Sequence, residues 1–270
     1  MTVKLTFLGT GGGRYATIYQ TRSTGGLILE TDGKRIHIDP GPGALTNMSR
    51  IVMDPARTDA ILISHCHPDH YSDAEVLIEG MCKGGVAKRG ELVGSLSVME
   101  GFEGLGPRLT EYHFGMVEKH TCVRPGDVIE VCGIRTEITS SKHSDRTAVG
   151  FKFHTSDGII SYVCDTNVSE NVIKEHIGSR VLILPVTRPT KARIKCHLCT
   201  EDVIKFAETV HPELIIFTHM GVRMIQEGPE KEAAYAESET GVRTIAADDL
   251  MTVTISDDVS VSEAEISFLP

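Results

Sequence analysis

Short apolar runs, interrupted by glycine, aspartate and proline residues, recur along most of the chain. Runs of this length that are rich in β-branched side chains are typical of strands. The pattern predicts strands at residues 3–8, 27–30, 35–38, 60–63, 128–131, 134–138, 149–153, 159–163, 181–184 and 214–217. Residues 250–255 and 265–269 are expected to add edge strands.

Three segments carry apolar residues at helical spacing instead, at residues 73–81, 168–177 and 200–210, and a further helix is expected at 229–236. Thr200 is expected to be the N-cap of the third of these helices. Strands outnumber helices, so the pattern predicts two central sheets whose outer faces are covered by a few amphipathic helices, a layered α/β sandwich. No repeat, linker or low-complexity tract interrupts the chain, and we expect a single domain over residues 1–270.

Composition and charge limit the classes of function. The 270 residues are 40% hydrophobic, which suffices for one large core, but no stretch approaches the ~20 apolar residues of a membrane span. The N-terminus lacks the features of a secretory signal, so we expect a cytoplasmic protein without membrane partners. The net charge of −10 argues against binding of long nucleic acids. A small anionic substrate could still be met by metal ions and local arginines; Arg14, Arg146 and Arg223 are candidates, although an exposed position is favoured for each.

The seven cysteines form no disulfide framework, and we expect reduced thiols. Cys196 and Cys199 form a CxxC pair around His197. A redox switch or a metal-capture site is one interpretation, but no second pair completes a structural zinc site, and buried thiols are favoured.

The strongest chemical signal follows the apolar run 60–63, where His65, His67, Asp69 and His70 stand within six residues. His65 and His67 are two apart, so in extended backbone their imidazoles leave the same side and can converge on one ion. Asp69 and His70 can then address a neighbouring ion. Imidazole and carboxylate together suit zinc, manganese or iron. A polar surface turn is the alternative, but this density of ligands at a strand end favours a metal site.

These residues match the H-x-H-x-D-H signature in full, and the chain resembles the metallo-β-lactamase superfamily. The resemblance implies an αββα four-layer sandwich. Residues 8–13 and 38–43 are similar to the family's loops after the first strand and the second hairpin. No helical pattern follows the glycine run at 9–13, so a nucleotide-binding loop is not favoured.

The resemblance also implies the remaining ligands, one beyond each of three later apolar strands: His143, Asp165 and His219. In the family's arrangement, one ion would be held by His65, His67 and His143 and the other by Asp69, His70 and His219, with Asp165 bridging both. It implies two divalent ions, with zinc expected and manganese or iron as alternatives, and a bridging hydroxide as the nucleophile. Asp69 and His197 are the expected catalytic residues.

The run 196–200, followed by a helix and by His219, resembles ribonuclease Z, in which a histidine ahead of this helix acts near the scissile phosphate. His143 and Asp165 enclose only a short hairpin, which leaves no room for that family's tRNA-binding arm. The resemblance therefore favours compact phosphodiesterases that act on a small or cyclic phosphodiester or a short RNA. An acyl hydrolase of lactones, thioesters or β-lactams and a non-catalytic regulatory protein are the alternatives, and a homodimer is compatible with each. Substrate walls are expected in loops such as 84–106.

Overall fold

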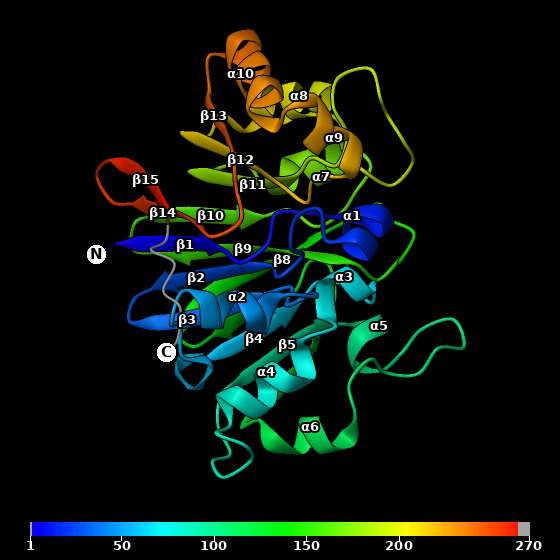
Figure 1. Ribbon diagram of the computed structural model, residues 1–270, viewed down its shortest axis with the longest axis vertical. Coiled ribbons are helices and arrows are strands. Elements are labelled where there is room, and N and C mark those ends of the chain that lie inside the picture. The colour runs from blue at the N-terminus through cyan, green and yellow to red at the C-terminus, as the bar shows by residue number, and fades with distance from the viewer. Residues whose placement is uncertain (1, 264–270) are drawn as a thin grey trace.

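The computed structural model describes residues 2–263, which form two mixed sheets packed face to face (Figure 1). The first sheet has the strand order β15-β14-β1-β2-β3-β4-β5-β6 and the second the order β13-β12-β11-β10-β9-β8-β7. The strands are β1 (Val3–Phe7), β2 (Leu27–Thr31), β3 (Lys34–Ile38), β4 (Ala60–Ile63), β5 (Glu91–Ser95), β6 (Lys119–Val123), β7 (Val128–Val131), β8 (Ile134–Ser140), β9 (Val149–Thr155), β10 (Gly158–Tyr162), β11 (Val181–Pro185), β12 (Leu214–Thr218), β13 (Arg243–Ala246), β14 (Met251–Ile255) and β15 (Val259–Glu263).

The period-two alternation of the strands builds three apolar layers. In β4, Ala60 and Leu62 face the core between the sheets, while Ile61 and Ile63 face the outer side of the first sheet. The second sheet follows the same rule, because alternate residues of β11 and β12 enter the central core and the outer core. Strands buried on both faces need continuous apolar sequence, which is why they stood out as unbroken runs.

Helices close the two outer faces, with α4 and α6 on one side and α8 and α10 on the other (Figure 1). The predicted αββα sandwich is therefore confirmed. The helices are α1 (Gly13–Tyr19), α2 (Ala44–Arg50), α3 (Pro68–Tyr71), α4 (Ala74–Met81), α5 (Leu96–Met99), α6 (Glu111–Met116), α7 (Glu170–Glu175), α8 (Thr200–Val210), α9 (Val222–Glu227) and α10 (Pro229–Thr240), with a 3-10 turn at Pro55–Arg57. Within the described residues, no helix is long and apolar enough to cross a membrane.

Most predicted elements are present within two residues of their expected bounds, and α8 matches its prediction. The N-cap of α8 is Cys199 rather than Thr200, because Cys199 has the extended backbone and completes a capping box with Asp202. The Thr200 hydroxyl instead donates to the buried Glu232 at 2.5 Å. The edge strand expected at 265–269 lies outside the described residues.

Two further predictions about local structure were wrong. A helix, α1, does follow the glycine run; its only buried side chain is Ala16, so it has no apolar stripe that could have announced it. The segment 84–106 is not a plain loop, because it contains the parallel strand β5 and the helix α5. Gly94, Ser95 and Ser97 weaken the strand signal of residues 91–99.

His176 at the end of α7 makes stability depend on pH. Its ring is fully buried, and neither ring nitrogen has a hydrogen-bond partner among residues 2–263. Burial, and then the charge of Lys152, lower the pKa of His176 from 6.5 to about 3. Below pH 6.5, His176 therefore takes up a proton in the unfolded chain but not in the folded chain. The stability of the fold falls as the pH drops toward 3.

Between pH 6.5 and pH 4, the free energy of unfolding of the wild type should fall by on the order of 3 kcal/mol more than that of His176→Leu. Urea unfolding at several pH values measures this difference. His120→Leu, which changes an exposed histidine on β6, is the matched control and should keep the wild-type slope. Equal slopes for wild type and His176→Leu would refute the assignment.

Candidate metal centre

The predicted site residues come together at one edge of the sandwich. His65, His67, Asp69 and His70 follow β4. The other three predicted ligands follow β8, β10 and β12. The turn after β4 continues into α3, whose first residue is Pro68, so the chain reverses directly beyond His67. His143, Asp165 and His219 each stand within three residues of the end of a strand. All seven predicted ligands lie in one cluster, which falls into overlapping groups that could hold metal ions.

The first group is His65, His67 and His143. The Nδ1 atom of His67 lies 2.9 Å from His65 Nε2 and 3.1 Å from His143 Nε2. A tetrahedral zinc ion with bonds of about 2.0–2.1 Å separates its nitrogen ligands by roughly 3.3 Å. The observed spacing is close to that value.

The outer contact of His143 fixes its tautomer. Its Nδ1 lies 2.9 Å from the carbonyl oxygen of Cys196, which can only accept, so Nδ1 carries the proton. In the neutral ring, Nε2 then presents a lone pair toward His67. Such an arrangement, with the outer nitrogen bonded to a carbonyl and the inner one free, is typical of metal-binding histidines.

The second group is Asp69, His70 and His219. His70 Nδ1 donates to the buried carboxylate of Asp39 at 2.8 Å, so its Nε2 faces His219 Nε2, 3.2 Å away. Asp39 is held in turn by Ser64 and Tyr162, whose hydroxyls donate to Oδ2 at 2.6 and 2.8 Å. Asp39 thus orients His70 without entering the cluster.

Asp165 lies between the two groups. Its Oδ2 is 3.2 Å from His219 Nε2, 3.8 Å from His70 Nε2 and 4.0 Å from His143 Nε2. Its Oδ1 is buried and has no hydrogen-bond partner among residues 2–263. An unpartnered carboxylate oxygen in the interior is costly unless a cation meets it.

The electrostatics of the cluster also favour positive charge at its centre. Burial lowers the pKa of His70, but the carboxylates of Asp39 and Asp69 outweigh it and raise that pKa to about 10. Burial raises the pKa of Asp165, and the charges of His219 and His70 reverse this and lower it. The proton on His70 supplies positive charge that a metal ion can supply in its place, so the donor set fits divalent metal ions.

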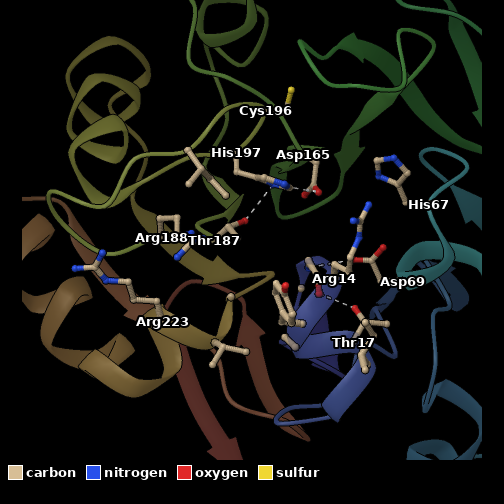
Figure 2. A pocket seen from close by; sticks show the side chains of 18 of the residues that line it. Arg14, Thr17, His67, Asp69, Asp165, Thr187, Arg188, Cys196, His197 and Arg223 are labelled. Carbon is tan, nitrogen blue, oxygen red and sulfur yellow. Dashed lines mark hydrogen bonds and ion pairs between the residues drawn. The ribbon is translucent and has the colours of Figure 1, made fainter.

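His197 stands beside the cluster in the loop before α8. Its Nδ1 is 3.5 Å from Asp165 Oδ2 and 3.4 Å from the hydroxyl of Thr187 (Figure 2). Burial lowers the pKa of His197 to about 4, although Asp165 acts in the opposite direction. His143, Asp165 and His197 also form a possible metal group, so the geometry alone leaves His197 two roles.

A cavity of about 1040 Å³ opens beside the cluster, between α1 on one wall and the loop before α8 with α9 on the other. Arg14 and Arg223 are exposed, as favoured from the sequence, and both also line the cavity. Arg146 pairs with Glu103 and is not part of the lining. The segment 84–106 contributes none of the lining, so its expected role as a substrate wall was wrong.

All seven cysteines are free thiols. Cys199 is buried as expected, and its Sγ lies 3.2 Å from Asp202 Oδ2, whereas Cys196 lines the cavity. The backbone N–H of Cys66 donates to Asp145 at 3.1 Å, and Asp145 also accepts from Ser97 and Thr147. Since Asp145 follows His143 by two residues, this network ties the two histidine-bearing loops together.

Three contributing residues were not predicted individually: Gly12 and Asp39 lie within the segments 8–13 and 38–43 that resemble family loops, and Thr187 carried no sequence signal. The carboxylate of Asp39 and the hydroxyl of Thr187 act through histidines far away in the sequence, a pairing visible only in the fold. A methyl group at Gly12 would lie 2.2 Å from the His219 ring, so the glycine run provides space for the site.

Comparisons with known proteins agree with this architecture. Residues 34–220 match the family described as β-lactamase superfamily domains. An uncharacterized protein of Methanocaldococcus jannaschii is 41% identical over 249 residues, which cover 92% of this chain and 93% of that protein. Ribonuclease Z of Pyrobaculum islandicum is 25% identical over 266 residues, covering 85% of this chain and 89% of the relative.

Among solved structures, the metallo-β-lactamase fold protein YhfI of Bacillus subtilis superposes with a TM-score of 0.78 at 17% identity, covering 94% of this chain and all of that one. At this identity the likeness concerns the fold. The matched segment 34–220 contains every histidine and aspartate of the cluster. The chain therefore belongs to the metallo-β-lactamase superfamily of metal-dependent hydrolases.

Proposed function

We propose that the protein is a dinuclear metal-dependent phosphodiesterase acting on a small or short phosphodiester. His65, His67 and His143 would hold one ion, and the second would be held by Asp69, His70 and His219, with Asp165 shared. Zinc is the expected metal. Bound ions would supply positive charge to the scissile group and lower the pKa of a water molecule.

The positively charged side chains that line the cavity are the observation that favours a phosphodiester substrate. The chain has a net charge of −10, yet among residues 2–263 the only carboxylates that line the cavity are Asp69 and Asp165, both assigned to the proposed metal ions. Four cations line it: Arg14, Arg188, Lys195 and Arg223. The Arg223 guanidinium donates a hydrogen bond to the Glu227 carboxylate at 2.7 Å. The other three side chains have no ion pair or hydrogen bond with any residue in 2–263. Unpaired cations around a metal site favour an anionic substrate. The similarity to a ribonuclease supports the same choice.

Thr187 would determine which ring nitrogen of His219 and of His197 carries a proton. If His219 uses Nε2 as a ligand, its Nδ1–H must donate to the Thr187 hydroxyl, 3.1 Å away. That hydroxyl can then donate to His197 Nδ1, which leaves the His197 Nε2–H directed away from this pair and available to a substrate oxygen. His197 would thus donate a hydrogen bond to the phosphoryl or leaving oxygen.

The test is turnover of bis(p-nitrophenyl) phosphate by protein loaded separately with zinc and with manganese, beside p-nitrophenyl acetate and a simple lactone. We expect metal-dependent cleavage of the phosphodiester at a rate at least 10-fold above that of the acyl substrates. Preferential cleavage of an ester or lactone would replace the proposal with an acyl hydrolase. Two bound metals without cleavage of any of these substrates would favour the non-catalytic alternative.

Gly12 offers a test of the second ion in which no proposed ligand is itself replaced. We expect Gly12→Ala to push the His219 ring aside, because the added methyl would overlap it. The zinc content should fall from two toward one per chain and turnover by about 10²-fold. Gly106→Ala, where an added methyl meets no atom within 4 Å, is the control and should keep both. Full metal content and turnover in Gly12→Ala would contradict the assignment of His219.

A further inference from the structure

The helix α1 presents large side chains to the cavity instead of to the core. Tyr15, Ile18 and Tyr19 are 67%, 63% and 71% exposed, and all three line the cavity beside the metal cluster. Only Ala16 of this helix is buried. Three large apolar side chains gathered on one exposed helix at a candidate active site indicate a binding surface.

This surface is fixed relative to the metal cluster. The backbone N–H of Gly13 donates to Asp69 Oδ2 at 3.0 Å, and that of Gly12 donates to the carbonyl of Met220 at 3.0 Å, next to His219. The Thr17 hydroxyl closes the first turn by donating to the Gly13 carbonyl at 2.9 Å. A ligand on α1 therefore meets the cluster at a set distance.

The charges around α1 specify the chemistry of that ligand. Arg14 precedes Tyr15 directly, and its guanidinium has no partner among residues 2–263. In the view of Figure 2, Arg14 lies on the Asp69 side of His197, with Arg188 on the opposite side. Aromatic side chains beside unpaired cations are the combination that binds single-stranded nucleic acid, since bases stack on the rings and phosphates meet the cations. The volume of about 1040 Å³ exceeds what a lone phosphodiester group needs.

We propose that α1 is a base-binding wall and that the substrate is a short oligonucleotide. A base next to the scissile bond stacks on Tyr15 or Tyr19, and Arg14 neutralises a flanking phosphate. This inference rests on the proposed function, because it names the substrate class of the same site. The acidic chain limits the ligand to the few nucleotides that the cavity holds.

A binding experiment tests the wall independently of hydrolysis. The chain has no tryptophan, so Tyr19→Trp introduces a single reporter. On stopped-flow mixing of the zinc-loaded variant with the dinucleotide ApA, before turnover, we expect the fluorescence to be quenched; the counterpart in which both adenines are replaced by hydrogen should not quench it. Tyr112→Trp, at a 63% exposed tyrosine outside the cavity, is the matched control and should stay unchanged. Equal quenching by ApA and by the abasic counterpart would overturn the proposal that α1 binds a base.

Kinetics give the second readout. We expect kcat/KM for ApA to exceed that for the abasic counterpart, and this ratio to fall about 10-fold or more in the double variant Tyr15→Ala/Tyr19→Ala. The double variant with phenylalanine should keep the ratio, because the rings remain. Hydrolysis of both compounds at equal rates would refute base binding by α1 but would not contradict the proposed function. Base-dependent quenching without hydrolysis refutes the proposed function and leaves the wall standing.

Discussion

Replacing Asp165 with alanine will reduce metal-dependent phosphodiester hydrolysis by about 10³-fold or more, the largest loss that we expect from any single substitution. In the part of the chain that the structure describes, its Oδ2 is the one carboxylate oxygen within 4.0 Å of histidines from both proposed metal groups. Removing it would take away the negative charge that the two proposed ions share and would let them drift from their shared position. Several kcal/mol of charge stabilisation depend on that position.

The same variant should bind zinc more weakly, so zinc should raise its melting temperature less than that of the wild type. Asp165→Asn keeps the shape and removes the charge, and it should lose activity to a similar degree. A purely structural role would spare the asparagine variant. Wild-type turnover in Asp165→Asn would therefore exclude a bridging carboxylate at this position.

Replacing His197 with alanine should lower turnover by roughly 10²-fold while both metal ions remain bound. His197 lies against Asp165 and Thr187 but outside the two proposed groups of ligands. The size of the loss should depend on the leaving group. If His197 donates to the leaving oxygen, the deficit will be small for p-nitrophenolate, which departs without help, and large for a ribose alkoxide.

Metal content separates this role from the alternative in which His143, Asp165 and His197 hold an ion. Loss of one zinc ion in His197→Ala would make His197 a ligand. Thr187→Val provides a further comparison, because it removes the hydroxyl that orients His197 and His219 without touching either ring. It should reproduce part of the His197→Ala deficit.

The sequence predicted the layers of the fold and the segments that carry the site, for a physical reason. Strands buried on both faces must be apolar throughout, and ligands at strand ends stand directly beyond such runs, as His65 does after β4. The family signature then ordered the later residues, whose loops the fold brings to one edge of the sandwich.

What the sequence did not reveal are features created by tertiary contact. The helix α1 buries only Ala16, so no apolar period marks it, and yet it forms one wall of the cavity. Arg14 looks like an ordinary surface arginine until the fold turns it toward Asp69. Asp39 precedes a proline-glycine turn and gives no sign that it holds His70.

We propose above that the cluster of histidines and aspartates binds two metal ions per chain. Calorimetric titration of the metal-free protein with zinc measures that number directly, with His67→Ala and His219→Ala titrated beside the wild type. Two tight sites in the wild type and one in each variant are the expected result. Absence of tight binding in a folded wild-type protein, or two sites retained in both variants, would contradict it.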